Sequence, residues 1–384
     1  MKLYSVFIVL QFIYFIHIVL YYFFWKKAIK NQTVNYTAIQ NKFISIIIVA
    51  RNEEAYIENC IKSILAQSYD SKNWELIIVD DFSEDNTVSI AYNYISDKIH
   101  LIELKKILPA ENAFTANKKT AITHAIQIAK GEIIACTDAD CEVGETWLQL
   151  INDSFQNEKI QFVTGPVLFK NENTFLDKFQ IVDMYSLIGI TCATIQMEKP
   201  YMCNGANLAY RKNTFISCNG FDGIDKLATG DDVLLMHKIH ARFGKNSINY
   251  LNTKSAIVYT HTEETLLGLY HQRTRWVSKT TSYNSMFILF TAIFMYFYHT
   301  AILFLPLLLL YFHQSFYIFI YCFGVKLFLD TFFIHKISKH FDKKYSVLLM
   351  PIFELVYMIY VCVIGLSAIV GRYTWKNRKL KSKY

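Results

Sequence analysis

Residues 131–142 read GEIIACTDADCE, an apolar run that ends abruptly in two aspartates, Asp138 and Asp140. A short apolar run bounded by polar residues is typical of a buried β-strand. On an extended chain, residues two apart point to the same face, so these carboxylates should lie side by side. Like charges held together repel, unless a cation screens them. The stretch predicts a strand end that can bind a cation, although a capped turn would leave the same pattern.

Three earlier segments resemble this one. The apolar runs FISIIIVA, WELIIVDD and KIHLIEL are predicted as buried strands at 43–50, 74–81 and 98–104. Helical patterns lie between the strands, at 53–67, 86–96 and 117–129. Strands that alternate with helices predict an α/β fold with a mostly parallel sheet. In such sheets, ligands bind beyond the carboxyl ends of the strands. The polar residues of Arg51–Glu53, Asp80–Asp81 and Asp138–Asp140 all fall at such ends.

Phosphate-binding glycine loops are missing from the sequence. Neither a GxGxxG after the first strand nor a GxxxxGK[ST] occurs. A protein without such loops can hold a diphosphate through Mg²⁺ or Mn²⁺. The cation is bound by one or two carboxylates and by the phosphate oxygens. Asp138 and Asp140 are the candidates for this metal site.

The apolar segments predict a membrane protein. Residues 3–25 are apolar over about a membrane thickness and run into Lys26, Lys27 and Lys30. Bulky aromatics instead of small residues before the lysines favour an uncleaved anchor over a signal peptide. Segments at about 286–312, 315–334 and 347–370 are also long enough to span, and a lysine-rich loop is expected at 335–344. The predicted organisation is an anchor at 1–27, a catalytic domain at 41–260, an amphipathic interfacial helix at 261–284, membrane segments at 286–370 and a basic tail at 371–384.

Composition agrees with a membrane setting. Hydrophobic residues make up 53% of the 384 residues, and the formal net charge is +7. The basic residues cluster beside apolar segments, which indicates a membrane surface and no nucleic-acid partner. The eight cysteines form neither a CxxC pair nor a zinc-ligand cluster, so reduced thiols in the cytosol are expected.

Three further constellations carry candidate chemistry. Asp80 and Asp81 end a strand, and the following residues SEDNT can cap the next helix. Capping explains those following residues but not the two adjacent acids. Asp231 and Asp232 begin a helix. Carboxylates at this position can stabilise the helix through its dipole, or one of them can act as a general base. The segment LLGLYHQRTRWVSKT at 266–280 is predicted as an amphipathic helix with an apolar stripe and cationic Arg273, Arg275 and Lys279.

Together these motifs resemble the membrane-bound family-2 glycosyltransferases of GT-A fold. That group includes cellulose and hyaluronan synthases and ceramide glucosyltransferases. The motifs occur in the family's order: VARNEE at 49–54, VDDFSEDNT at 79–87, NKKTAI at 117–122, TDAD at 137–140, NGANLAYRK at 204–212, GDD at 230–232 and QRTRW at 272–276. The resemblance covers roughly residues 43–280 and implies a GT-A domain, which is a Rossmann-like nucleotide-sugar domain, with membrane helices on both sides.

The resemblance also implies a role for each motif residue. Asp140 would bind the metal together with Asp138, and Asp232 would be the catalytic base. Asp231 remains an alternative base, because Gly230-Asp231-Asp232 departs from the family's Thr-Glu-Asp type motif. The donor would be bound by Arg51, Glu53, Asp80, Asp81, Lys118, Asp138, Gln272, Arg275 and Trp276. The acceptor would lie against Asn204, Gly205 and Trp276.

The implied reaction is transfer of a sugar, with inversion, from a nucleotide-diphosphate donor, a UDP-sugar by expectation, to a hydroxyl. The favoured acceptor is a lipid or another membrane-associated molecule. The alternatives are a processive synthase of an exported polysaccharide and, against the retained motifs, an inactive scaffold. The expected location is a cell membrane of the bacterial inner-membrane type, crossed several times, with the catalytic domain in the cytosol. Lys326 and Asp330 lie inside an apolar segment and should pair, whereas Glu354 has no evident partner.

Overall fold

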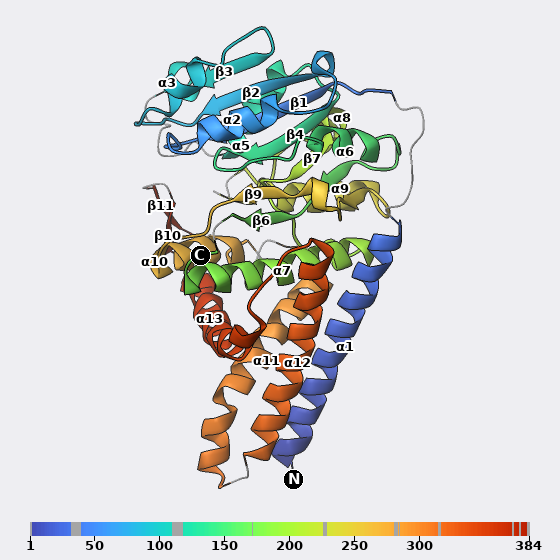
Figure 1. The fold of residues 1–384 in the computed structure, drawn as a ribbon, viewed down its shortest axis with the longest axis vertical. Coiled ribbons are helices and arrows are strands. Elements are labelled where there is room, and N and C mark those ends of the chain that lie inside the picture. The colour runs from blue at the N-terminus through green and yellow to red at the C-terminus, as the bar shows by residue number, and fades with distance from the viewer. Residues whose placement is uncertain are drawn as a thin grey trace.

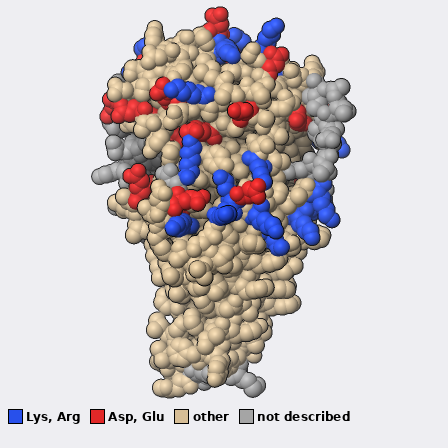
Figure 2. Space-filling view, in the orientation of Figure 1, with Lys and Arg blue, Asp and Glu red and all other residues tan. Residues whose placement is uncertain are grey.

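The computed structural model places an α/β domain above a bundle of long helices, with helix α7 lying crosswise between them (Figure 1). The structure describes residues 2–31, 40–109, 118–170, 172–225, 229–279, 283, 285–313, 316–370, 372–375 and 378–381. On the face shown in Figure 2, charged side chains gather on the α/β domain, whereas the described part of the bundle presents uncharged residues.

Four parallel strands form the centre of the α/β domain, in the order β3, β2, β1, β4. Their bounds are Ile99–Glu103, Trp74–Asp80, Ile44–Ala50 and Ile133–Asp138. Every residue of β2 and all but one of β1 are buried, which explains their continuous apolar sequences. The register places Ala50 beside Asp80 and Val49 beside Asp138, so the carboxyl ends meet at one edge of the sheet. The four predicted strands are confirmed.

The other half of the sheet contains one reversed strand. Strand β7 (Leu208–Arg211) runs antiparallel to β4 and to β5 (Phe162–Thr164). Strand β8 (Ile248–Tyr250) pairs in parallel with β5. A separate small sheet pairs β6 (Val167–Phe169) with β9 (Val258–Thr260), also in parallel. The prediction of a mostly parallel sheet is confirmed.

Amphipathic helices accompany the strands. The helical pattern at 53–67 predicts one apolar side, and in α2 (Ile57–Leu65) this side is buried through Ile57, Cys60, Ile61 and Ile64. Leu65, at the end of the helix, is 40% exposed. The helices predicted at 86–96 and 117–129 are shorter in the structure, as α3 (Thr87–Tyr92) and α5 (Lys118–Ile128). The remaining elements of this domain are η1 (Ser71–Asn73), α4 (Leu104–Ile107), α6 (Trp147–Ser154), α8 (Lys212–Ser217), α9 (Val233–Phe243), η3 (Lys254–Ala256) and α10 (Leu266–Val277).

Four helices in the described part of the chain are long and apolar enough to cross a membrane. They are α1 (Lys2–Asn31), α11 (Met286–Tyr311), α12 (Tyr317–His340) and α13 (Met350–Val370), the last preceded by η5 (Val347–Leu349). Helix α12 continues through His340, so the expected loop at 335–344 is wrong for its first half, which is helical. Helix α1 likewise extends past residue 27.

Helix α13 connects the bundle of long helices with α10 at the base of the α/β domain. Near its start, Glu354 contacts Lys326, which lies midway along α12. Near its end, the Ser367 hydroxyl lies 2.8 Å from the Thr274 hydroxyl of α10, at the base of the α/β domain (Figure 1). The helix therefore rises from the middle of the bundle back toward that domain. Strand β10 (Arg372–Trp375), which follows it, packs against α10 and pairs with β11 (Arg378–Lys381).

A buried cluster of charged and polar side chains ties the long helices together. Lys326 Nζ lies 2.7 Å from Asp330 Oδ2 and also contacts the Glu354 carboxylate. Tyr14 of α1 donates its hydroxyl hydrogen to Asp330. The expected Lys326–Asp330 pair is present, and the expectation that Glu354 has no partner is wrong. Because unpaired charges inside a bilayer are costly, this cluster holds α13 against α12 and α1.

Helix α7 (Phe175–Gln196) connects the two halves of the molecule. It begins with a capping box in which Thr174 and Asp177 exchange side-chain and backbone hydrogen bonds. One side of α7 packs against α1 and α12. A Cβ atom added at Gly189 would lie 2.7 Å from the Phe333 ring of α12. Only glycine permits so close an approach of these two helices.

We therefore expect Gly189→Ala to lower the Tm of the detergent-solubilised protein by a few degrees, since overpacking costs about 1–3 kcal/mol. Gly324→Ala is the matched control, because a Cβ atom at Gly324, also in the bundle, would meet nothing within 4 Å. Thermal unfolding of both variants measures the difference. Equal Tm values would show that the α7–α12 contact is looser than the structure indicates.

Candidate active site

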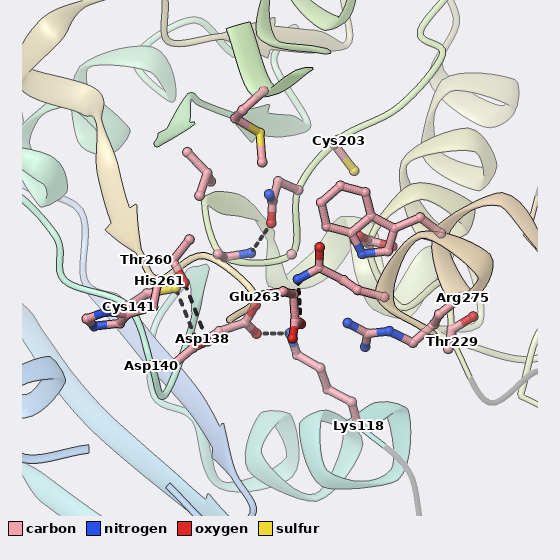
Figure 3. A pocket seen from close by; sticks show the side chains of 18 of the residues that line it. Lys118, Asp138, Asp140, Cys141, Cys203, Thr229, Thr260, His261, Glu263 and Arg275 are labelled. Atoms are coloured by element: carbon pink, nitrogen blue, oxygen red, sulfur yellow. Dashed lines mark hydrogen bonds and ion pairs between the residues drawn. The ribbon is translucent and has the colours of Figure 1, made fainter. Parts of the chain in front are cut away.

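A cavity of about 770 Å³ opens at the carboxyl ends of β1 and β4 and extends to α7 and α10 (Figure 3). It is lined by most residues that the sequence singled out, which come from segments more than 200 residues apart. They are Arg51, Glu53, Asp81, Lys118, Asp138, Asp140, Asn204, Gly205, Asp231, Asp232, Gln272, Arg275 and Trp276. Of the predicted site residues, only Asp80 is missing from this lining.

One end of the cavity is built by the turns after β1 and β2. Arg51 Nη1 donates a hydrogen bond to the backbone oxygen of Asp81 at 2.7 Å, which joins the two turns. Asp81 lines the cavity, whereas Asp80 does not. The Asp80 carboxylate instead accepts a hydrogen bond from the Ser83 backbone N–H at 3.2 Å. Burial raises the pKa of Asp80, against the effect of that bond.

Asp138 and Asp140, at the carboxyl end of β4, line the cavity. Oxygen and sulfur atoms of Asp138, Asp140 and Cys141 all lie within 4.8 Å of one another. The Cys141 thiol donates to Asp140 Oδ1 at 3.3 Å, and Thr260 Oγ1 donates to Asp140 Oδ2 at 3.4 Å. Two carboxylates at this spacing match the ligands that hard divalent cations prefer. Burial raises the pKa of Cys141 well above its ordinary value, so sulfur is a neutral neighbour of this pair.

Lys118, at the start of α5, links the two ends of the cavity. Its ammonium contacts Asp138 Oδ1 and lies 3.5 Å from Asp231 Oδ2. Figure 3 shows Lys118 and Arg275 reaching into the same space from different elements. Burial disfavours the charged lysine, but the two carboxylates outweigh this and raise its pKa well above the ordinary value. Lys118 therefore carries a full positive charge between the two acidic clusters.

Asp232 is the N-cap of α9. Its Oδ1 accepts hydrogen bonds from the Val233 backbone N–H at 2.7 Å and from Lys279 Nζ at 3.0 Å. Its Oδ2 faces Gly205, where an added Cβ atom would lie only 3.6 Å away. Burial alone would raise the pKa of Asp232, but the Lys279 ion pair and the Val233 hydrogen bond hold it below its ordinary value. Asp232 is thus an ionised carboxylate with one oxygen directed into the cavity.

Helix α10 carries the QRTRW motif. Gln272 Nε2 donates to Glu263 Oε1 at 2.9 Å, and Arg275 and Trp276 line the cavity. Exposure along this helix, which spans Leu266–Val277, does not simply follow the polarity of its residues. Leu266 is 75% exposed, whereas Arg273 is buried, stacked 4.1 Å from the Trp276 ring and 2.9 Å from Asp183 of α7.

Two family models match this chain. The family model described as glycosyl transferase family 2 matches residues 45–217, and the model for glycosyl transferase family group 2 matches residues 133–370, more than half of the chain. The chain belongs to the family-2 glycosyltransferases. The match includes α7, α10 and the long C-terminal helices as well as the α/β domain.

Two relatives of this glycosyltransferase are poly-beta-1,6-N-acetyl-D-glucosamine synthases. The one from Staphylococcus epidermidis is 28% identical over 267 residues, which are 69% of this chain and 61% of that protein. The one from Staphylococcus aureus is 26% identical, over 66% of this chain and 59% of the relative. The aligned region thus spans about three fifths of the relatives' length.

A solved structure supports the fold of this glycosyltransferase. The mannosyltransferase PcManGT from Pyrobaculum calidifontis, determined with GDP-Man and Mn²⁺, superimposes with a TM-score of 0.57 over 96% of this chain and 99% of its own. Sequence identity is 14%, so the likeness concerns architecture alone.

Some residues in or near the cavity of this glycosyltransferase were not predicted from the sequence to take part in the site. Glu263 lies in the cavity next to Gln272, but the predicted domain boundary at 260 separated its segment from the strands. Lys279 was predicted only as one of the cationic residues of the helix at 266–280. Lys119 is 3% exposed and donates to the Thr229 backbone oxygen at 2.7 Å. The acidic pair of HTEE at 261–264, directly after a strand, is the signal that could have identified Glu263.

The Lys279–Asp232 pair predicts how activity depends on pH. With the Asp232 pKa held below its ordinary value, the carboxylate stays ionised into the acidic range, so activity should persist there. In Lys279→Met, burial is left unopposed by the lysine and the Asp232 pKa should rise. The acid limb of the initial-rate profile should therefore move to higher pH. Lys279→Arg, which keeps the charge, should restore the original limb, and an unmoved limb in Lys279→Met would assign the base elsewhere.

Proposed function

We propose that this protein transfers a sugar, with inversion, from a nucleotide-diphosphate donor to a hydroxyl of a membrane-associated acceptor. One observation carries the proposal: a single ammonium, that of Lys118, contacts Asp138 on one side and lies 3.5 Å from Asp231 on the other. The candidate donor carboxylates and the candidate base region therefore adjoin, as a one-step transfer between two substrates requires.

The donor is proposed to lie along Arg51, Glu53 and Asp81 at the nucleotide end and along Lys118 and Arg275 at the diphosphate end. Tyr56 and His261, with ring centroids 4.5 Å apart, form an aromatic wall beside Arg51 and Glu53. Asp140 and Asp138 would hold Mg²⁺ or Mn²⁺, which supplies charge neutralisation on the departing diphosphate when bound. The clustering of their oxygens within 4.8 Å supports this assignment.

The proposed reaction is a single displacement. The acceptor oxygen attacks the anomeric carbon while the bond from that carbon to the diphosphate oxygen breaks, so the configuration inverts. Asp232 Oδ2 accepts the hydroxyl proton, since Oδ1 is already occupied by Val233 and Lys279. The bonding electron pair leaves with the nucleoside diphosphate. Arg275 and Lys118 stabilise the negative charge that develops there.

Synthesis of a polysaccharide is the second candidate function. The names of the staphylococcal relatives favour it, because they are synthases of a poly-N-acetylglucosamine. A UDP-sugar donor would suit either function. An inactive scaffold is disfavoured, because every predicted site residue except Asp80 lines one cavity.

Release of nucleoside diphosphate tests the function directly. Membranes containing the protein are incubated with a panel of UDP- and GDP-sugars, and we expect one donor to be consumed in a manner that depends on divalent metal. Asp140→Asn should abolish this consumption while leaving the protein folded, because it removes a charged ligand and keeps the shape. A variant with normal turnover would disprove the metal assignment.

The two candidate bases can be separated by the same assay. Asp232→Asn should lower turnover by at least about 100-fold while donor binding persists, since a general base typically contributes a factor of 10²–10⁴. Asp231→Asn should be milder, because Asp231 Oδ2 lies 3.5 Å from the Lys118 ammonium and is paired with it. The opposite order would move the base to Asp231.

We also propose that the α/β domain faces the cytosol and that α1, α11 and α12 cross the membrane. Lys26, Lys27 and Lys30 at the domain end of α1 support this through the positive-inside rule. In a cysteine-free background, Lys344→Cys should be protected from an impermeant thiol reagent in intact cells and labelled after lysis. Phe312→Cys, at the opposite end of the bundle, should be labelled without lysis. Labelling of Lys344→Cys in intact cells would overturn this orientation.

A further inference from the structure

The side of the cavity formed by α7 carries no charged side chain. Its floor is a stripe on α7 with the spacing of one helix face: Met184, Leu187, Ile188 and Thr191. Cys203 and Tyr250 complete the lining. We call these six residues the apolar arm. Met184 and Ile188 are each only 4% exposed, so the arm is sheltered from bulk water.

The apolar arm begins at the candidate base. Cys203 precedes Gly205 by two residues, and a Cβ atom added at Gly205 would lie 3.6 Å from Asp232 Oδ2. Tyr283 lies at the same end of the cavity, 6.4 Å from the ring of Tyr201 and 4.8 Å from that of His237. A group bound against the apolar arm would therefore share one cavity with Asp232.

The far side of the apolar arm borders the long helices. Helix α7, its floor, packs through its other side against α1 and α12, where Gly189 meets Phe333. Tyr283 precedes the start of α11 at Met286 by only three residues. Both borders of the arm are therefore formed by segments that join the α/β domain to candidate membrane spans.

The chemistry of the lining separates two classes of acceptor. A glycan chain needs hydrogen-bonding side chains along its path, but the hydroxyl of Thr191 already donates to the Leu187 backbone oxygen at 2.7 Å. The remaining members of the arm, apart from the Tyr250 hydroxyl, offer carbon and sulfur surface. Such a lining gains free energy by removing hydrocarbon from water. It also offers no cation to an acceptor phosphate, because Lys279 is paired with Asp232.

We propose that the apolar arm holds the hydrocarbon chain of a lipid acceptor, with the lipid hydroxyl at Asp232. This inference rests on the proposed function and specifies its acceptor as a lipid and not a growing glycan. The reaction is unchanged: the lipid oxygen forms the new bond to the anomeric carbon and its proton passes to Asp232. Entry from the bilayer beside α7 would spare the lipid any passage through water.

The partition of the labelled product between organic and aqueous phases shows whether the acceptor is a lipid or a glycan. Membranes containing the protein are incubated with tritiated UDP-glucose, UDP-N-acetylglucosamine, UDP-galactose or GDP-mannose, and the products are extracted with chloroform and methanol. We expect label in the organic phase. Label in a water-soluble polymer of high molecular mass would overturn the lipid inference while upholding sugar transfer. Donor consumption indistinguishable from that of Asp140→Asn would overturn the proposed function and the inference with it.

A matched pair of variants tests the apolar arm itself. Leu187 and Ile190 are neighbouring, half-buried residues of α7, but only Leu187 lines the cavity. With host lipid extract titrated into the solubilised protein, Leu187→Gln should raise the lipid concentration needed for half-maximal transfer about tenfold, with the rate recovering at high lipid. Ile190→Gln should leave that concentration unchanged, and the Tm of both variants shows that they fold. Equal effects of the two substitutions would overturn the assignment of the arm.

Discussion

The ion pair between Arg273 and Asp183 fixes the helix that carries the QRTRW motif to the helix on which the domain rests. The two charges lie 2.9 Å apart, and both side chains are at most 3% exposed. Removal of one partner from a buried pair typically costs about 3–5 kcal/mol, because the other charge is left unpaired. Burial still raises the pKa of Asp183, despite the opposing effect of Arg273, so the pair is held under strong desolvation. The positions of Gln272, Arg275 and Trp276 in the cavity depend on this contact and on the Thr274–Ser367 hydrogen bond to α13.

Much of the α/β domain could be predicted because its sequence signals are local. Each parallel strand is a short apolar run, and each candidate ligand follows such a run directly, so the edge of the sheet where they meet follows from topology. Asp80 shows the limit of this reasoning. The sequence marks both Asp80 and Asp81 as strand-end acids, but only the folded turn after β2 decides that Asp81 lines the cavity and Asp80 does not.

The parts that could not be predicted depend on contacts between distant segments. Arg273 was predicted only as a cation of an amphipathic helix, yet it is buried, because Asp183, 90 residues earlier, supplies a carboxylate there. Glu354 finds Lys326 through the return of α13 into the bundle, which no local pattern encodes. Lys279 likewise meets Asp232 only in the folded chain. In each case a charge that seemed isolated in the sequence is neutralised across helices.

The return of α13 has a consequence for anyone who attaches another protein to this one. A partner fused after residue 381 would begin beside α10, because β10 packs against that helix. It would compete for the space next to the motif that lines the cavity. A partner fused before residue 2 would begin at the far end of the bundle, about 45 Å away along the 30-residue helix α1. A purification tag before α1 therefore stays clear of the cavity, whereas one after β11 does not.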